Sequence, residues 1–389
     1  YGIDNPLFLE DMQDREYLLK TLLPWLVKYQ VNIRKACRLS QPVAAYLKRF
    51  TSNQALIDMI VQHFFEDTPT FFALSYFGLY LDYLYPKGGT GVLAQTVTDY
   101  IRRAGGEILT NTAVTRVDTL QKQLHTAGGD TYCYKKLVWA ADQKSLYSAA
   151  GETHTPQVDN QRDLTEKGQG GDSILSLFMG INLDKNYFEG RCGAHAFYTP
   201  STIGLSSLTD WNKSIATEEG LYEWIGQYLE RTTYEISCPA LRDASLAPEG
   251  KTGVIVSTLM DYHLVKHLSE TVNYEQFKEL CTRKIIEVLE ASVFSGITEK
   301  VEFALCATPL TVERETGNAH GAITGWSFTN DKLPAESRFR QITNSIKTPM
   351  EDVYQCGQWT FSPSGLPVSI LTGKLAADAI HKTLKVCGS

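Results

Sequence analysis

Residues 353–368 read VYQCGQWTFSPSGLPV and place a glycine-rich break between a short apolar strand and a helix. The strand ends near Cys356, Gly357 opens the break, and Gly365 stands directly before the expected helix, with Pro367 in its first turn. Proline is common in a first helical turn, because the N–H group that it lacks has no partner inside the helix there. The N–H groups of a helix start carry partial positive charge, so the break is either an ordinary turn or part of a site for an anionic cofactor.

A second junction of the same kind lies in residues 85–108, which read YPKGGTGVLAQTVTDYIRRAGGEI. Gly88 and Gly89 form a turn, and the apolar residues after it recur at three- and four-residue spacing, which predicts a helix with one apolar face. Gly105 and Gly106 supply the left-handed conformation in which helices commonly end. Glycine lets a backbone approach a ligand closely, but most glycine turns before helices are only turns, so neither junction identifies a ligand by itself.

The chain before this junction is helical in pattern. Residues 7–84 carry apolar side chains at three- and four-residue spacing. Within them, the segment 71–85 is rich in phenylalanine and tyrosine. Aromatic side chains fill protein cores and also line apolar pockets, so this segment is either a buried core helix or a wall around a greasy substrate. Both interpretations stay open.

Strand patterns dominate the regions that follow. Residues 108–142 predict short strands (ILTNT, AVTRVDTL, KQLHT and TYCYKKLVWAAD), with a hairpin turn at 128–130 between the last two. The run at 137–141, LVWAA, is wholly apolar, as expected of a strand buried on both faces. Residues 143–170 are polar and predict a loop or crossover. Residues 173–330 alternate strand and helix patterns, as in a sheet with helices packed against it.

Composition disfavours several classes of function. The 389 residues are 43% hydrophobic with a net charge of −7, and no dense Lys/Arg run occurs, which disfavours nucleic-acid binding. The 8 cysteines are scattered without a CxxC pair, which fits a reduced cytoplasmic protein. No apolar run approaches the ~18 to 20 residues of a membrane span, and no signal peptide is visible. Contact with a membrane surface is left open.

The sequence contains no motif for a metal or for a nucleophile. The 8 histidines include one i, i+4 pair, His263 and His267, but no HExxH motif and no third ligand nearby, so we expect no metal. The serine elbow GxSxG does not occur, and the SPSG run at 362–365 does not replace it. No cysteine lies in an evidently electropositive stretch, so no catalytic residue is identified.

Several separate motifs, in order from about residue 45 to 385, resemble the phytoene desaturase and carotenoid isomerase-like flavoproteins of the amine oxidase superfamily. Residues 85–108 resemble the family's P-x-GG, helix, GGEI run. Residues 241–251, LRDASLAPEGK, are the most specific match, because the family has D-P-S-L-A-P-x-G-K there. Further resemblances are TAVTRV at 112–117, LVWAAD at 137–142, GNAHGAITGW at 317–326 and the stretch 353–368.

The resemblance implies a fold that is both α/β and α+β, with an incomplete FAD/NAD(P)-binding Rossmann-like domain and a mixed-sheet substrate domain with a helical cap. The implied domains are 1–84 (the helical part of the substrate domain), 85–150 (part of the FAD-binding domain), 151–335 (the substrate domain, a sheet plus helices) and 336–389 (the C-terminal part of the FAD-binding domain). The implied cofactor is FAD. Its implied contacts are Gly88, Gly89, Val114, Gly357, Gln358, Gly365, Leu366, Pro367 and Val368.

Two features depart from the family pattern. The family begins with a strand, GxGxxG and a helix that hold the FAD pyrophosphate, whereas GxGxxG does not occur in this sequence, which begins with Tyr1. We therefore expect an N-terminally truncated chain that lacks the pyrophosphate-binding segment and exposes the strand at 137–141. Gln358 stands where many members carry an acidic residue on the ribityl chain, and it can still donate or accept hydrogen bonds.

The implied activity is that of an FAD-dependent oxidoreductase acting on an apolar isoprenoid or carotenoid-like substrate by hydride transfer to flavin, of the desaturase or isomerase type. The activity of this chain alone is left open. The helix start at 365–368 would stabilise negative charge on a reduced flavin, and His195 and His320 are expected to be structural. One alternative is a non-catalytic module that binds an apolar ligand and has lost flavin binding. Another is a different flavoenzyme of the superfamily.

Overall fold

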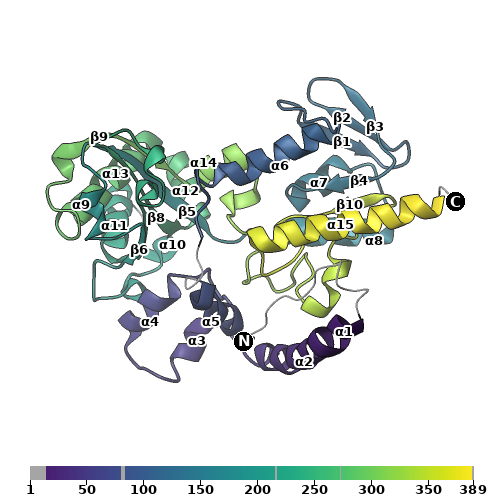
Figure 1. Cartoon of the computed structure of the whole chain (residues 1–389). Coiled ribbons are helices and arrows are strands. Elements are labelled where there is room, and N and C mark those ends of the chain that lie inside the picture. The colour runs from purple at the N-terminus through teal and green to yellow at the C-terminus, as the bar shows by residue number, and fades with distance from the viewer. Residues whose placement is uncertain (1–14, 80–83, 215–216, 272, 388–389) are drawn as a thin grey trace. The chain divides into compact units, whose positions relative to one another are not determined.

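The computed structural model describes residues 15–79, 84–214, 217–271 and 273–387 (Figure 1). The chain forms two compact units, one ending at Leu84 and one beginning at Tyr85. The first unit is helical where it is described, as its apolar spacing predicts. Its elements are α1 (Arg15–Tyr17), a π-helical turn (Leu18–Leu22), α2 (Leu23–Cys37), α3 (Val43–Leu47), α4 (Gln54–Val61) and α5 (Thr70–Leu79).

The aromatic segment contributes to a small core within the first unit. Ala73 of α5 is buried together with Val43 and Phe64. The ring of Tyr76 meets that of Phe64 edge-on, with 5.7 Å between the ring centroids. Aromatic pairs favour this geometry. Ala73 is buried while Leu74 is 48% exposed, so both interpretations of the segment stay predictions, and residues 80–83 lie outside the described residues.

The second unit contains a five-stranded sheet with the order β6-β7-β8-β5-β9. Each of its four described ladders is antiparallel, whereas we expected a mixed sheet. A helical connection, such as the one between β8 and β9, can join parallel or antiparallel strands. The alternation of strand and helix patterns along the chain therefore could not decide the relative direction of the strands. The strands are β5 (Ser173–Ile181), β6 (His195–Tyr198), β7 (Tyr234–Ser237), β8 (Thr252–Met260) and β9 (Val301–Ala307).

Helices bury one face of this sheet. α11 (Glu218–Arg231) and α13 (Tyr274–Glu290) each carry a stripe of buried residues four apart, and both stripes enter one core with the strands. Every second residue of β8 is buried and the residues between are half-buried. The opposite face of the sheet carries exposed apolar side chains, among them Phe178 and Phe303.

Two smaller sheets complete the strands of the second unit. β4 (Leu137–Trp139) and β10 (Val353–Gln355) pair in parallel, with Leu137 opposite Val353. β1 (Val114–Asp118), β2 (Gln123–Thr126) and β3 (Thr131–Cys133) form an antiparallel meander, and the predicted glycine turn connects the last two. The predicted ILTNT strand is wrong, because residues 108–112 have no regular structure.

The polar stretch 143–170 contains two helices, so of the two predictions, a loop or a crossover, the loop is wrong. α7 (Gln143–Ala149) is capped by Asp142, and α8 (Pro156–Lys167) is capped by Thr155 with proline in its first turn. Capping residues followed by a proline are helix-start signals that the polar composition obscured.

β4 is buried on one face only. Leu137 and Trp139 lie in a buried cluster with Val117 of β1 and Leu146 of α7. Val138 between them is 37% exposed. Side chains of a strand alternate between its two faces, and the described chain packs against one of them. Burial on both faces therefore does not hold for the described residues, and the exposed Val138 agrees with the expectation that this chain exposes the strand at 137–141.

The remaining helices of the second unit are α6 (Gly91–Arg103), α9 (Asn186–Glu189), α10 (Trp211–Ser214), α12 (Tyr262–Thr271), α14 (Pro309–Thr316) and α15 (Leu366–Cys387). The longest is α15, which starts at the glycine break after β10 and contacts that strand (Figure 1). The domain boundaries expected within residues 85–389 stay predictions.

The sheet core gives a matched pair of phenylalanine substitutions. Phe277→Ala removes a fully buried ring of α13 and should lower the free energy of unfolding by about 3–5 kcal/mol. Phe303→Ala removes a ring that is 64% exposed on β9 and should change it by about 0.5 kcal/mol or less. Urea unfolding followed by circular dichroism measures both, and equal losses would contradict the described core.

Candidate functional site

The glycine turn before α6 is held by the most specific motif of the sequence. Gly88 and Gly89 both have φ near +90° (88° and 89°), a conformation that favours glycine. The N–H group of Gly88 donates to Oδ2 of Asp243 at 2.7 Å, and Oδ1 of Asp243 accepts from Ser245. These hydrogen bonds, first that of Gly88, lower the pKa of Asp243. The LRDASLAPEGK stretch therefore fixes the Gly88–Gly89 turn through an ionised carboxylate.

Val114 lies at the start of β1, at the edge of the cluster that buries β4. It is half-buried and packs against this cluster, which also contains Leu137, Trp139 and Val353. Val114 therefore lies beside the parallel pair of β4 and β10.

The glycine break after β10 is an irregular segment between a strand and an open helix start. The N–H group of Cys356 donates to the carbonyl of Trp139, which extends the pairing of β10 with β4. Gly357 has φ +95°, and its N–H group donates to Oγ1 of Thr372 in α15 at 3.0 Å. The strand end and the helix are thereby tied together at this glycine.

The start of α15 is accessible. A Cβ at Gly365 would have only Pro367 within 4 Å, and Leu366 is 59% exposed. The first-turn N–H groups of a helix have no carbonyl partner within it. Gly365, Leu366, Pro367 and Val368 therefore present an open helix N-terminus, as the sequence predicts.

The loop 317–326 packs directly on this junction. Gly325 has φ +66°, and a Cβ there would lie 2.3 Å from the carbonyl oxygen of Gln358, so only glycine fits. Oγ of Ser364 donates to the carbonyl of Thr324 at 2.9 Å. The indoles of Trp326 and Trp359 meet edge-on at 4.8 Å between centroids, and Nε1 of Trp326 donates to the carbonyl of Trp359.

A buried carboxylate joins this loop to the end of β4. Asp142 is 4% exposed, and its Oδ1 accepts from the N–H group of Lys144 at 2.6 Å as the N-cap of α7. Its Oδ2 accepts from the N–H group of Ala319 at 2.6 Å. Burial raises the pKa of Asp142, and the two N–H groups oppose that rise. One side chain thus caps a helix and anchors the loop.

His320 is fixed as a neutral imidazole. The N–H group of Gly170 donates to its Nδ1 at 3.1 Å, so that nitrogen carries no proton. Burial, followed by the charges of Lys144 and His263, lowers the pKa of His320 to about 4. The backbone N–H group of His320 donates to Oε1 of Glu313, and Oε2 of the same carboxylate accepts from the hydroxyl of Tyr262. His195 lies elsewhere, on β6, where it contacts Glu235 at 2.7 Å.

The three predicted groups stay predictions as one site. Val114 packs on the cluster that contains Leu137 and Trp139 of β4 and Val353 of β10, and the break 357–368 follows β10 in the chain. The Gly88–Gly89 turn is joined to Asp243 instead, and no contact joins it to the other two groups among the described hydrogen bonds. Sequence reasoning matched the motifs of Asp243, Asp142 and Gly325 but gave these residues no role, because the contacts that define them come from distant parts of the chain.

Two negative findings apply to the described residues. Within 15–79, 84–214, 217–271 and 273–387, no group of three or more His, Cys, Asp or Glu side chains is placed to hold a metal ion. In the same ranges, no helix combines the length and the hydrophobicity of a bilayer span.

The chain has relatives among known proteins, although no protein-family model matches it. It is 23% identical over 304 residues to phytoene desaturase (lycopene-forming) of Pantoea ananas, which covers 77% of this chain and 56% of that protein. It is 23% identical over 295 residues to all-trans-retinol 13,14-reductase of Danio rerio, 70% of this chain and 46% of that protein. The resemblance to the phytoene desaturases is confirmed. The chain spans about half the length of these curated relatives.

Solved structures share its fold. An oxidoreductase from Methanosarcina mazei superimposes with a TM-score of 0.59 at 12% identity, covering 97% of this chain and 78% of that one. A putrescine oxidase variant gives a TM-score of 0.55 at 10% identity, covering 90% and 69%. The expected fold class, a Rossmann-like part with a further sheet and helices, is that of these solved structures.

The close approach of Gly325 to Gln358 can be tested by adding one methyl group. Gly325→Ala should lower the free energy of unfolding by about 2 kcal/mol or more, because the positive φ and the 2.3 Å contact both oppose a Cβ. Gly373→Ala is the control. A Cβ at this position within α15 would have no atom within 4 Å, so the substitution should raise the free energy of unfolding by about 0.5–1 kcal/mol. Thermal unfolding measures both, and a neutral Gly325→Ala would contradict the packing of the loop.

His320 should make stability depend on pH. Its pKa is about 4 in the folded protein and about 6.5 when unfolded, so between these values the unfolded chain binds more protons. Stability from this residue therefore rises as pH increases from about 4 to 6.5. His320→Asn, which tolerates the positive φ, should flatten that rise in urea midpoints measured across this range. An unchanged slope would show that His320 is not the group responsible.

Proposed function

We propose that the chain acts as, or within, an FAD-dependent oxidoreductase that transfers hydride from an apolar isoprenoid or carotenoid-like substrate to flavin. The observation that carries the proposal is its similarity, over 70% or more of its length, to two proteins named for phytoene and for all-trans-retinol. Both names denote apolar polyenes of isoprenoid origin. The first of these names denotes a desaturase, and desaturation is the direction proposed here.

The described residues fit an anionic ring system at the junction between β10 and α15. Gly357 leaves the strand end without a side chain, Gly365 leaves the helix start open, and Leu366 and Val368 follow in the first turn. Gln358 adds an amide that can donate and accept. Val114 would lie toward the adenine side, and the Gly88–Gly89 turn would hold a further part of the cofactor. The pyrophosphate would be held by a segment outside these 389 residues, because GxGxxG does not occur in them.

The bound flavin would supply the redox chemistry by accepting a hydride. The contribution of the chain is electrostatic and steric. The N-terminus of α15 presents partial positive charge, which would stabilise the negative charge of a reduced flavin bound there. The loop 317–326 holds this junction rigid through Gly325, Ser364 and the buried Asp142. The hydride step itself needs no side-chain acid or base. The proton that the adjacent carbon loses as the double bond forms would pass to water, because the junction is built mainly from glycine and backbone groups.

The exposed face of the five-stranded sheet is the proposed wall of the substrate site. Ser173 at the start of β5 donates to the carbonyl of Gly321, so this strand begins at the loop that packs on the junction. Farther along β5, Phe178 stands opposite Ile255 of β8 on the face away from the sheet core. A long apolar substrate lying along β5 would contact these side chains while one end reaches the junction.

A charge placed at the helix start tests the flavin site without breaking the fold. Leu366→Glu changes an exposed side chain, and a glutamate in a first turn favours the helix. It should nevertheless weaken FAD binding at least tenfold, because it competes with the anionic cofactor for the same N–H groups. Leu384→Glu, near the other end of α15, is the matched control and should leave FAD binding unchanged.

Flavin absorbance of the purified polypeptide and titration with FAD measure the effect. A yellow protein whose affinity falls only in Leu366→Glu supports the proposal. A colourless protein that retains an isoprenoid would instead indicate a non-catalytic module that has lost flavin binding. Equal affinity in both variants would contradict the placement of the flavin at the start of α15.

A further inference from the structure

The first unit carries a basic segment in an otherwise acidic chain. Residues 15–50 contain eight lysines and arginines and one acid, Glu16, which is paired with a lysine four residues on. Their net charge is +7, so the remainder of a chain whose net charge is −7 carries −14. The side chains of Lys28, Arg34 and Arg38 are exposed, and no ion pair to them occurs among the described residues. A surface of this charge attracts anionic partners.

Exposed apolar side chains form one stripe along α2 (Figure 1). The stripe consists of Leu23, Leu26, Val27 and Val31. Intervals of three and four residues place these side chains on the same side of the helix. Their exposed fractions lie between 40% and 61%. Arg34 comes three residues after the last of them and continues the same side, so the helix combines an uncovered apolar stripe with positive charge.

A second element of the first unit repeats this combination. α3 ends at Leu47, and the next three residues, Lys48, Arg49 and Phe50, are all exposed. Phe50 is 70% exposed, although its ring lies 5.1 Å from that of Tyr46 between centroids. An apolar ring thus stands beside two cations, outside the buried cluster of this unit.

We propose that the first unit binds the surface of a membrane that contains anionic lipids. The apolar stripe of α2 and the ring of Phe50 enter the headgroup region, and the cations of residues 15–50 contact lipid phosphates. Helices that lie in a membrane surface combine exposed leucine-like side chains with lysine and arginine in this way. The proposal rests on the surface of the first unit and not on the flavin site.

Two other classes of partner fit these residues less well. A nucleic acid would engage the cations but would leave the exposed leucine and valine side chains in water. A protein groove that receives an amphipathic helix would cover α2 and leave residues 48–50 unused. A lipid surface has phosphate groups for the cations and an apolar layer beneath them for both apolar elements.

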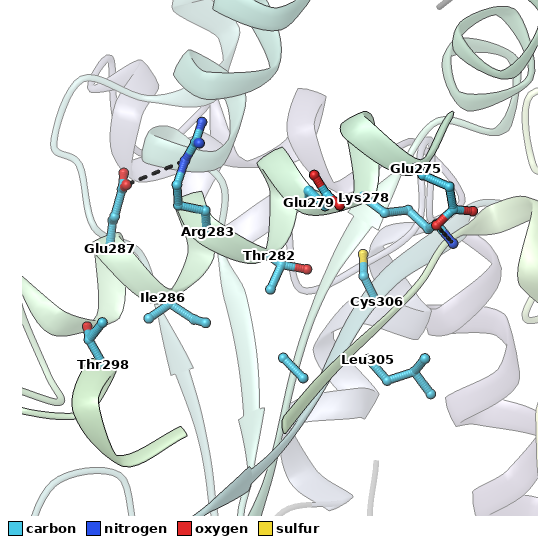
Figure 2. A pocket seen from close by; sticks show the side chains of 11 residues that line it. Glu275, Lys278, Glu279, Thr282, Arg283, Ile286, Glu287, Thr298, Leu305 and Cys306 are labelled. Carbon is cyan, nitrogen blue, oxygen red and sulfur yellow. Dashed lines mark ion pairs between the residues drawn. The ribbon is translucent and has the colours of Figure 1, made fainter. Parts of the chain in front are cut away.

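The groove between α13 and β9 in the second unit has the opposite charge (Figure 2). Its lining combines apolar side chains such as Leu305 with three glutamates, one lysine and one arginine. Figure 2 shows the ion pair of Arg283 with Glu287, at 3.7 Å. An excess of negative charge is repelled by an anionic surface, so exposed apolar side chains at this groove do not predict lipid binding.

Removal of single cations tests the electrostatic contribution. Lys28→Gln and Arg34→Gln keep residues that favour a helix. Each should weaken binding to vesicles of phosphatidylcholine mixed with phosphatidylglycerol about fivefold, which is the effect of one cation near an anionic surface. Lys28→Arg keeps the charge and should bind as the unchanged chain does.

Removal of the apolar stripe tests the second contribution. The double variant Leu23→Gln with Val27→Gln replaces two exposed side chains and should weaken binding at least tenfold, because apolar area no longer enters the lipid. Leu120→Gln is the matched control. This leucine is 88% exposed in the turn between β1 and β2 of the second unit, and its replacement should leave binding unchanged.

Sedimentation with vesicles measures the bound fraction of the polypeptide at its natural length, without FAD or substrate, and circular dichroism checks that each variant is folded. Binding to the anionic vesicles that falls in the glutamine variants of α2, but not in Lys28→Arg or Leu120→Gln, supports the proposal. No binding to the anionic vesicles would overturn it, which is also the result expected if an acidic protein covers α2. Equal binding to vesicles of phosphatidylcholine alone, or unchanged binding of the double variant, would overturn it as well.

Discussion

The candidate site depends on one close approach between two backbone segments, that of Gly325 to the carbonyl of Gln358. A side chain at residue 325 would need the space that this oxygen occupies. Because glycine is present there, the loop 317–326 lies flat on the break between β10 and α15, and the hydrogen bond from Ser364 to Thr324 and the packed indoles follow from that position. The open helix start is thereby held in one place.

Asp142 anchors the other side of the same loop. A buried carboxylate is costly unless its oxygens accept hydrogen bonds, and here both do, from Lys144 and from Ala319. The end of β4, the start of α7 and the loop are therefore coupled. Since β4 also pairs with β10, the strand that leads into the glycine break and the loop that covers it have a common support. A rigid frame around an accessible helix start is the arrangement a cofactor site requires.

Local features of this site were predictable from the sequence, and its long-range contacts were not. Gly88 and Gly357 were identified from residue type alone, because a positive φ before a helix leaves glycine as the ordinary choice. The helical stripes of the sheet core followed from four-residue spacing. Asp142, Asp243 and Gly325 received no role, because each contacts a residue far along the chain. The apolar run at β4 was taken to be covered on both faces, and composition could not reveal that the described chain packs on only one.

The central claim is that the protein oxidises an apolar polyene through a bound flavin. It is tested most directly by mixing the FAD-loaded polypeptide that carries these residues, at its natural length and without oxygen, with phytoene in lipid vesicles or with putrescine. The absorbance of the oxidised flavin is followed in both mixtures. The account predicts that phytoene bleaches the flavin as a more unsaturated polyene forms, while putrescine leaves it oxidised. Bleaching by the amine alone would contradict the account.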